Sequence, residues 1–312
     1  MQQICQLCLK EKTICESHIQ PKFIFEWLKE TSVTGYLRGA ESPNMRMQDG
    51  FKQYLFCKQC EDIFGKDEKS FSEEVFKPYV NEELDDWGSA TSKIKAFTHE
   101  EWLLRFVIGL QFRHLLMVDE KFVEKVGKSR YDKLRINQEI WRQYLLGERQ
   151  DTGAQNRSYM ILLQNLAFAS GNFPPGLSPK VNSYILRATD ADVTFSKDGK
   201  MGVYSKIGPI ALFTTIVPKQ VRGLGKAVIK KQGAFPVVQH LDDKSGILHF
   251  IMVDRPKEAM DKIDISEKQR KKIDDAYKKN EDRMDTHSVK AQISDQILAD
   301  SLDANGFDES AG

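Results

Sequence analysis

Apolar residues in the middle of the chain recur at helical spacing. From Trp102 to Leu110 they stand three and four positions apart, which is typical of a helix with one buried face. Thr98 followed by Glu101 matches a capping box, so we expect this helix to begin near Thr98. The same periodicity predicts a second helix at about residues 130–146.

Residues 160–253 show a different pattern, in which apolar runs alternate with turn residues. The strand-like runs are SYILRAT, MGVYSKIGPIALFTTIV and GILHFIMV, and the turns between them include SKDGK and DDKSG. Such runs predict a largely antiparallel sheet, with one hairpin turn at residues 197–200. The polar segment 151–159 is interpreted as a linker, residues 256–285 as one highly charged helix, and the end beyond about Asp300 as a frayed tail.

The first 80 residues combine a polar interruption with a helical pattern. Residues 31–49 are polar and contain two glycines and Pro43, which predicts an insertion or long loop. After Cys60 the apolar positions suit a helix with a weak point at Gly65 and an end near Pro78.

Composition and charge then narrow the class of protein. The 312 residues are 40% hydrophobic and 29% charged, which is typical of a globular protein. Because 46 Lys and Arg face 45 Asp and Glu, the net charge of +1 excludes a uniformly basic nucleic-acid coat. The start MQQICQLC lacks the pattern of a signal peptide, and no stretch reaches the roughly 18 apolar residues of a membrane span. We therefore expect a cytoplasmic protein with no membrane partner.

Four of the five cysteines form two identical pairs. These are Cys5-x-x-Cys8 and Cys57-x-x-Cys60, and Cys15 is left over. In a reducing compartment two such pairs indicate one structural Zn²⁺ with four thiolate ligands rather than disulfides. The interval between Cys8 and Cys57 is wider than the roughly 15–20 residues of a compact ribbon, so the intervening chain must leave and return. Two unrelated thiol pairs in a reduced core are the alternative.

A further motif lies between the two cysteine pairs. A first C-x-x-C, then Ser17-His18-Ile19-Gln20-Pro21, then a second C-x-x-C opening a helix resembles the HNH nucleases, whose domain is a treble-clef or ββα-metal fold. The resemblance covers residues 5–70, and this part is also similar to a group of bacterial proteins with HNH-like zinc domains. It implies that His18 is a general base, that Mg²⁺ or another divalent cation sits beside it, and that phosphodiester bonds of DNA or RNA are hydrolysed.

The motif also departs from the pattern of that family. Ser17 stands where active members have an acidic metal ligand, and Glu61 follows Cys60 where they have Asn. Glu61 and Glu68, seven residues apart on one helical face, are therefore candidates for a second metal site. Further candidate oxygen ligands are Glu16, Asp62 and Asp67. Alternatively, His18 is a zinc ligand or a hydrogen-bonded structural residue.

Residues 199–241 contain no Asp or Glu. This stretch has several basic residues that are candidate nucleic-acid contacts, namely Lys219, Arg222, Lys226, Lys230 and Lys231. Gly223 and Gly225 would let the backbone approach phosphates, where each basic contact releases counterions. An exposed basic loop, balanced by acidic residues elsewhere, explains the pattern equally well.

Together these patterns predict an α+β protein with three regions. They are an HNH-like zinc-binding domain at 1–80, a helical region at 81–150, and an α+β region at 151–312 with a charged C-terminal helix. The functional hypothesis is a zinc-binding, metal-dependent nuclease or a nucleic-acid-binding protein. The alternative is a catalytically inactive, zinc-stapled scaffold or protein-interaction module. The oligomeric state stays open.

Overall fold

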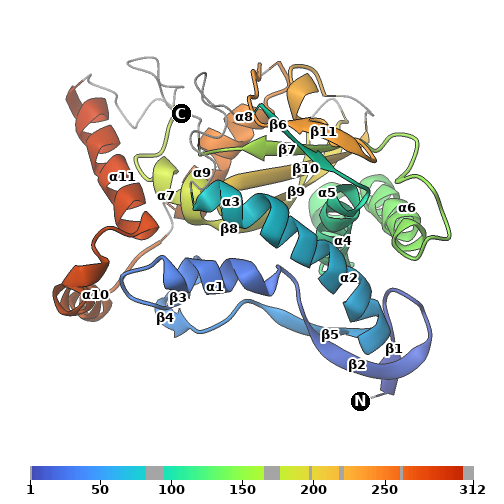
Figure 1. Cartoon of the computed structure of the whole chain (residues 1–312), viewed down its shortest axis with the longest axis horizontal. Helices are drawn as coiled ribbons and strands as arrows, with labels where there is room; N and C mark the ends of the chain where they lie inside the picture. Colours follow the sequence, from blue (N-terminus) through green and yellow to red (C-terminus); the bar gives the residue numbers. More distant parts are fainter. Residues whose placement is uncertain are drawn as a thin grey trace.

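The computed structural model describes residues 2–81, 95–164, 176–196, 199–217, 221–242, 244–260 and 263–304. A four-stranded antiparallel sheet lies at its centre (Figure 1). Its strands in spatial order are β7 (Ser158–Leu162), β10 (Ile210–Val217), β9 (Met201–Ile207) and β8 (Thr189–Phe195). The predicted antiparallel sheet is thus confirmed. The pairing of Phe195 with Met201 agrees with a hairpin at 197–200, of which residues 197–198 lie outside the described residues.

A second, three-stranded sheet is formed by the N-terminal residues. Its strands in spatial order are β1 (Gln2–Ile4), β2 (Glu11–His18) and β5 (Lys52–Cys57). Helix α2 (Lys58–Phe71) follows β5 directly and continues through the π-helical turn Ser72–Phe76 into α3 (Lys77–Val80). The expected end near Pro78 is confirmed, since α3 ends at Val80. No break occurs at the expected weak point, because Gly65 lies inside α2.

The interval between β2 and β5 contains regular structure. It holds helix α1 (Lys22–Glu30) and a small hairpin of β3 (Leu37–Gly39) and β4 (Ser42–Met47). The predicted insertion at 31–49 is therefore a hairpin rather than an open loop. This hairpin lies beside α1, below the central sheet in Figure 1.

Three helices lie between residues 102 and 145. They are α4 (Trp102–Leu116), α5 (Phe122–Val126) and α6 (Lys128–Leu145), and α6 confirms the helix expected at 130–146. The predicted capping box at Thr98 and Glu101 is not formed. Thr98 lies in strand β6 (Ala96–His99), where it pairs with Ala234 of β11 (Gly233–Pro236), and α4 begins after Glu101.

Two runs read as strands are helices. Much of SYILRAT lies in α7 (Val181–Arg187), and GILHFIMV forms α8 (Ile247–His249) and the π-helical turn Phe250–Asp254. A short apolar run does not distinguish a buried strand from a buried helix. These helices pack against sheet residues such as Tyr159 and Tyr204 in one apolar cluster.

The charged segment 256–285 is not one helix. Helix α9 (Arg255–Met260) ends early, α10 (Glu267–Lys279) starts after Ser266, and α11 (His287–Ala304) completes the described chain. Ser266 precedes α10 at a position where serine is common before helices. The predicted frayed tail lies partly in α11, and residues 305–312 fall outside the described residues.

The segment 151–159 is packed rather than a solvated linker. Thr152 and Asn156 are buried, and the Asn156 side-chain amide donates to Asn137 Oδ1 at 2.9 Å and to the Thr215 carbonyl at 3.0 Å. The Trp141 indole N–H donates to the Thr152 carbonyl. These contacts join α6 to β10 of the central sheet. None of the described helices is long and apolar enough to cross a membrane.

Candidate functional site

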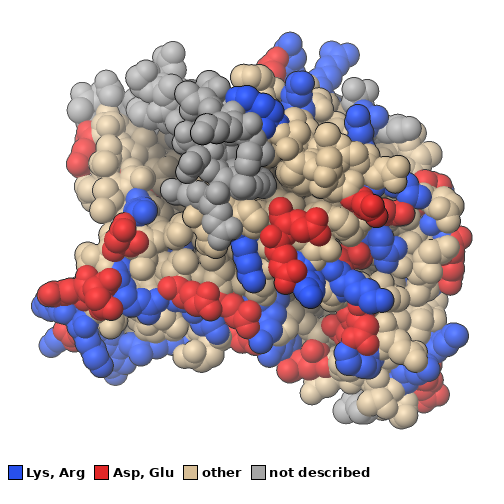
Figure 2. Space-filling view, viewed as in Figure 1, with Lys and Arg blue, Asp and Glu red and all other residues tan. Residues whose placement is uncertain are grey.

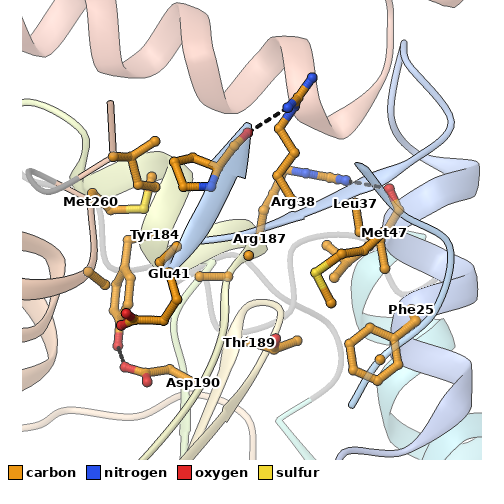
Figure 3. Close-up of a pocket in the computed structure, with 18 of the residues that line it drawn as sticks. Phe25, Leu37, Arg38, Glu41, Met47, Tyr184, Arg187, Thr189, Asp190 and Met260 are labelled. Atoms are coloured by element: carbon orange, nitrogen blue, oxygen red, sulfur yellow. Dashed lines mark hydrogen bonds between the residues drawn. The ribbon is translucent and has the colours of Figure 1, made fainter. Parts of the chain in front are cut away.

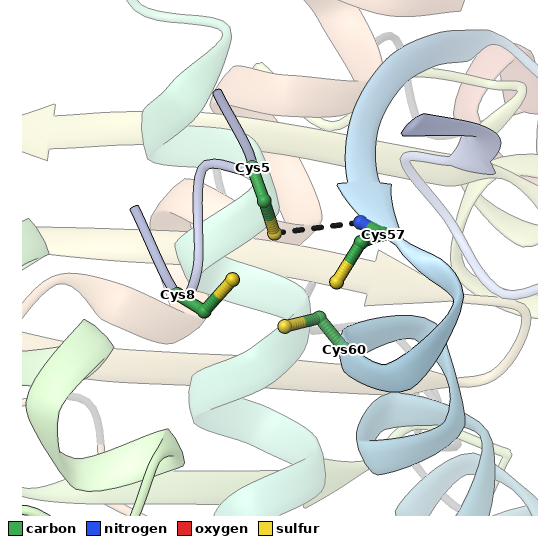
Figure 4. Close-up of side chains that lie close together, drawn as sticks. All are labelled: Cys5, Cys8, Cys57 and Cys60. Carbon is green, nitrogen blue, oxygen red and sulfur yellow. Dashed lines mark hydrogen bonds between the residues drawn. The ribbon is translucent and has the colours of Figure 1, made fainter. Parts of the chain in front are cut away.

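The four paired cysteines meet at one point (Figure 4). Cys5 and Cys8 lie on the turn between β1 and β2, Cys57 ends β5, and Cys60 lies in the first turn of α2. Their sulfur atoms all lie within 4.8 Å of one another. A tetrahedral zinc with Zn–S bonds of about 2.3 Å holds its sulfurs roughly 3.8 Å apart, so the cluster is compatible with zinc binding. Cys15 lies outside this group.

Backbone N–H groups at the turn favour a thiolate at Cys5. The Cys57 N–H points at Cys5 Sγ, at 3.4 Å, and the Cys5 N–H donates to the Lys10 carbonyl, which closes the turn. Burial raises the pKa of the Cys5 thiol, but hydrogen bonds from the backbone of Cys8, Cys57 and Leu7 outweigh it and lower the pKa to about 7. Because the thiolate is the form that binds zinc, this environment prepares a ligand.

His18 is the last residue of β2 and is not part of the cysteine cluster. Its Nε2 lies 3.0 Å from Oδ1 of Asp49, and its ring stacks on Phe25 at 6.3 Å between centroids. The residue after Asp49 must be glycine, because a Cβ on Gly50 would lie 2.0 Å from the Phe25 ring. The structure therefore places His18 beside a carboxylate and an aromatic ring, away from the thiols, which disfavours its alternative role as a zinc ligand.

Asp49 is held as a carboxylate by three donors. These are the Lys52 ammonium at 2.7 Å, the Gly50 backbone N–H at 2.8 Å, and His18. Burial raises the pKa of Asp49, but these hydrogen bonds outweigh it and hold the pKa well below its usual range. The bond to Asp49 in turn raises the pKa of Lys52. A lysine ammonium thus already occupies the carboxylate nearest to His18.

Glu61 and Glu68 are both engaged within the protein. The Ser17 hydroxyl donates to Glu61, and the buried Arg113 guanidinium forms an ion pair with Glu68. Burial raises the pKa of Glu61. Over the parts of the chain that the structure describes, the four cysteines are the only group of three or more candidate ligands close enough to share an ion. Within the described residues, Glu61 and Glu68 therefore belong to no such group of three.

Arg113 positions the strand that carries His18. Its guanidinium lies over the Phe64 ring and donates to the His18 carbonyl at 2.9 Å, besides its ion pair with Glu68. It therefore ties α4 to α2 and to the end of β2. Ser17 likewise ties the end of β2 to α2, because its hydroxyl donates to Glu61. In the HNH pattern this position holds a metal ligand.

The candidate nucleic-acid contacts lie elsewhere. Arg222, Lys226 and Lys230 are exposed, Lys231 forms an ion pair with Glu101 at 3.4 Å, and Lys219 falls outside the described residues. Their segment lies near β11 at the top of Figure 1, whereas β2 lies at the bottom. Figure 2 shows Lys and Arg interspersed with Asp and Glu over much of the face below. The structure does not bring these basic residues together with His18.

Asp49 and Lys52 are the functional candidates that the sequence reasoning missed. The signal was available in part, because an antiparallel return of the chain to Cys57 places residues near 52 opposite His18, and Lys52 is its partner in the register. The Asp49-Gly50 dipeptide is also a turn signal directly before that strand. Asp49 itself is fixed by the approach of Gly50 to Phe25, which no local pattern indicates.

Comparisons with protein-family models, with curated proteins and with solved structures found no match to this chain.

Proposed function

We propose that this chain is a zinc-stapled, HNH-like protein that hydrolyses phosphodiester bonds of nucleic acid, with His18 as general base. The observation that carries the proposal is the His18–Asp49 pair, joined at 3.0 Å at the end of β2. A turn with two cysteines, a β-hairpin, and a helix with the fourth cysteine in its first turn follow one another as in a treble clef. The motif of residues 5–70 points to the same family.

The proposed roles follow from the hydrogen bonds. With Nε2–H donated to Asp49, the Nδ1 atom of His18 is the basic nitrogen and accepts a proton from the attacking water. Asp49 keeps this tautomer and stabilises the imidazolium that forms, as the carboxylate does in a catalytic triad. The water oxygen attacks phosphorus, the bond to the leaving oxygen breaks, and the leaving oxygen takes up a proton from solvent water. The Lys52 ammonium, 2.7 Å from Asp49, is placed to offset charge on the phosphate.

The family resemblance also implies a divalent cation, and the residues around His18 do not fit it. Asp49 is bonded to Lys52 and to a backbone N–H, Glu61 to Ser17, and Glu68 to Arg113. A hard cation needs several oxygen ligands that are not already paired with cations. We therefore derive no step through such a cation.

A cleavage assay on plasmid DNA and single-stranded RNA tests this function. Zinc-loaded wild-type protein would be assayed without added divalent cation and then with Mg²⁺, Mn²⁺ or Ni²⁺, beside H18A, D49N and the matched control H240A, which changes an exposed histidine. General-base catalysis contributes typically 10²–10⁴-fold, so we expect H18A to lose at least about 100-fold and H240A to be unchanged. Cleavage by folded, zinc-bearing H18A at the wild-type rate would reject the assignment.

One observation favours the second candidate, a zinc-stapled scaffold without catalysis. The carboxylates of Asp49, Glu61 and Glu68 are all paired within the protein, so the frame is complete without a substrate or a catalytic metal. If folded wild-type protein retains zinc but cuts neither nucleic acid under any of these conditions, the scaffold replaces the nuclease as the conclusion.

A further inference from the structure

A large cavity lies between the β3–β4 hairpin and the edge of the central sheet (Figure 3). We call it the hairpin cavity. Its volume is about 1180 Å³, and its walls also include residues of α1, α7, β8, α9, α10 and α11. Ligand pockets of about 300–1000 Å³ hold small organic molecules, so this space is sufficient for one. His18 does not line it, although Ile19 and Gln20 do.

Arg187 is a cation in this wall without an acidic partner. Its guanidinium lies over the Trp27 ring at 5.0 Å and donates to Thr31 Oγ1 and to the Leu28 carbonyl, both at 2.8 Å. These bonds use two of its five N–H donors. Burial lowers the pKa of Arg187 to about 10, so it stays charged at neutral pH. Among the described residues no carboxylate forms an ion pair with it, and a half-buried charge of this kind favours an anionic partner.

Arg38 of β3 has the same property. Its guanidinium donates to the Pro43 carbonyl, to Gln269 Oε1 at 3.1 Å and to the Tyr36 hydroxyl at 3.4 Å, all of which are uncharged. Arg255, a third arginine of the cavity, differs because it pairs with Asp190, Asp192 and Glu258. Two of the three guanidinium groups therefore keep an uncompensated charge.

Two acidic side chains of the cavity, Glu41 and Asp190, lie apart from these two arginines. Figure 3 shows Glu41 and Asp190 on one side, while the guanidinium groups of Arg38 and Arg187 lie toward the other. Asp190 is further neutralised by Arg255, at 2.7 Å, and accepts from the Tyr184 hydroxyl. An anionic group is thus attracted to the arginine side of the cavity.

The remaining walls suit a flat ring with polar edges. Five phenylalanine and tyrosine side chains line the cavity, namely Phe25, Tyr36, Phe51, Tyr184 and Tyr277. Two further lining residues each bury a polar atom without a hydrogen-bond partner, Gln20 at Oε1 and His114 at Nε2. His114 is only 8% exposed, and burial lowers its pKa to about 3, so the imidazole is neutral. Aromatic faces with a few unpaired polar atoms are typical of sites for planar ligands.

We propose that the hairpin cavity binds a small organic anion with a planar ring. Its phosphate or carboxylate lies at Arg38 and Arg187, and its ring lies among the aromatic side chains. A guanidinium group binds both kinds of anion through paired N–H donors. This binding function goes beyond the proposed hydrolysis and does not involve His18.

Calorimetric titration of the full, zinc-loaded chain tests the proposal. The probes are adenosine 5′-monophosphate and phenyl phosphate as ring phosphates, benzoate as a ring carboxylate, adenosine as an uncharged ring, and inorganic phosphate as an anion without a ring. We expect at least one ring-bearing anion to bind at least tenfold more tightly than adenosine and inorganic phosphate. Comparing the phosphates with benzoate then distinguishes the two anion chemistries.

Three variants locate the site on the protein. R38Q and R187M should each weaken the best probe at least tenfold. The matched control is R283Q, because Arg283 also donates to carbonyls at the end of α1, those of Lys29 and Glu30, but does not line the cavity. Its affinity should stay within twofold of wild type. If R187M does not fold, R38Q decides, since Arg38 lies on the peripheral hairpin.

Several results would overturn the proposal. If none of the probes shows saturable binding, the site is rejected. If adenosine binds as tightly as its monophosphate, the anion subsite is rejected. Inorganic phosphate binding as tightly as the ring-bearing probes removes the ring subsite. An R38Q protein that binds like wild type, or equal losses in R38Q and R283Q, would show that the probe binds outside the hairpin cavity.

Discussion

Gly223, in the basic stretch, is a residue whose role changes once its neighbours are known. Its φ is +84°, and a Cβ at this position would lie 1.8 Å from the Asp242 carbonyl oxygen. The Asp242 N–H in turn donates to the Gly223 carbonyl at 3.1 Å. The glycine is therefore required where two backbone segments cross, whereas the sequence suggested a phosphate contact. At Gly225, two residues later, an added Cβ would meet only open space.

The pair of glycines gives a prediction with its own control. We expect G223A to lower the free energy of unfolding by at least about 1–3 kcal/mol, the usual cost of such backbone strain, and the backbone clash adds to it. G225A should change it by less than about 0.5 kcal/mol. Urea unfolding followed by circular dichroism measures both. Equal stability of the two variants would contradict the assigned crossing.

At the scale of elements, the cysteine cluster joins the turn between β1 and β2 to the junction of β5 and α2. The turn between β1 and β2 is tied to the end of β5 and to the start of α2 by the four sulfurs and by the bond from the Cys57 N–H to Cys5. Metal binding to such a set contributes directly to folding, with apparent energies of about 10–16 kcal/mol in small zinc domains.

Zinc content is expected to depend on the four clustered cysteines alone. C60S should lose the metal and lower the melting temperature, because three thiolates do not complete the tetrahedral site. C15S is the matched control, since Cys15 lies on the neighbouring strand but outside the cluster, and it should retain one zinc per chain. Elemental analysis after gel filtration measures both. Zinc retained in C60S, or lost in C15S, would reject the ligand set.

For the whole molecule, the apolar core joins the three regions that the sequence suggested. One cluster combines Phe56 and Phe64 of the cysteine region with Phe112 of α4 and Val203 of the central sheet, and another combines Phe71 with Met160 and Phe235. The rings of Phe56 and Phe112 lie 6.2 Å apart. Because the regions share their core, we expect them to unfold together.

Unfolding in urea should therefore release zinc and abolish secondary structure at the same midpoint. F112A, which removes a buried ring shared by two regions, should lower stability by about 3–5 kcal/mol and shift both signals together. I136A is the control, because Ile136 on α6 is 60% exposed. A chelating dye and circular dichroism report the two signals. Zinc release well before the loss of secondary structure would show an independently unfolding N-terminal domain.

Features that depend on local spacing were predictable from the sequence alone. The C-x-x-C pairs identified the four clustered residues, helical periodicity identified α6, and the run MGVYSKIGPIALFTTIV identified the strands β9 and β10 of an antiparallel sheet. Spacing determines these features because the repeat of a helix, a strand or a tight turn is fixed by the backbone.

Packing decided the rest, because it joins residues that are far apart in the chain. Most of the run SYILRAT forms helix α7. A short apolar run is compatible with both a strand and a helix, and the packing of neighbouring elements decides between them. Asp49 lies beside His18 because the chain returns along β5. Ser17 bonds Glu61, and Arg113 pairs with Glu68, because α2 and α4 pack beside β2. Arg38 and Arg187, far apart in sequence, face one cavity for the same reason.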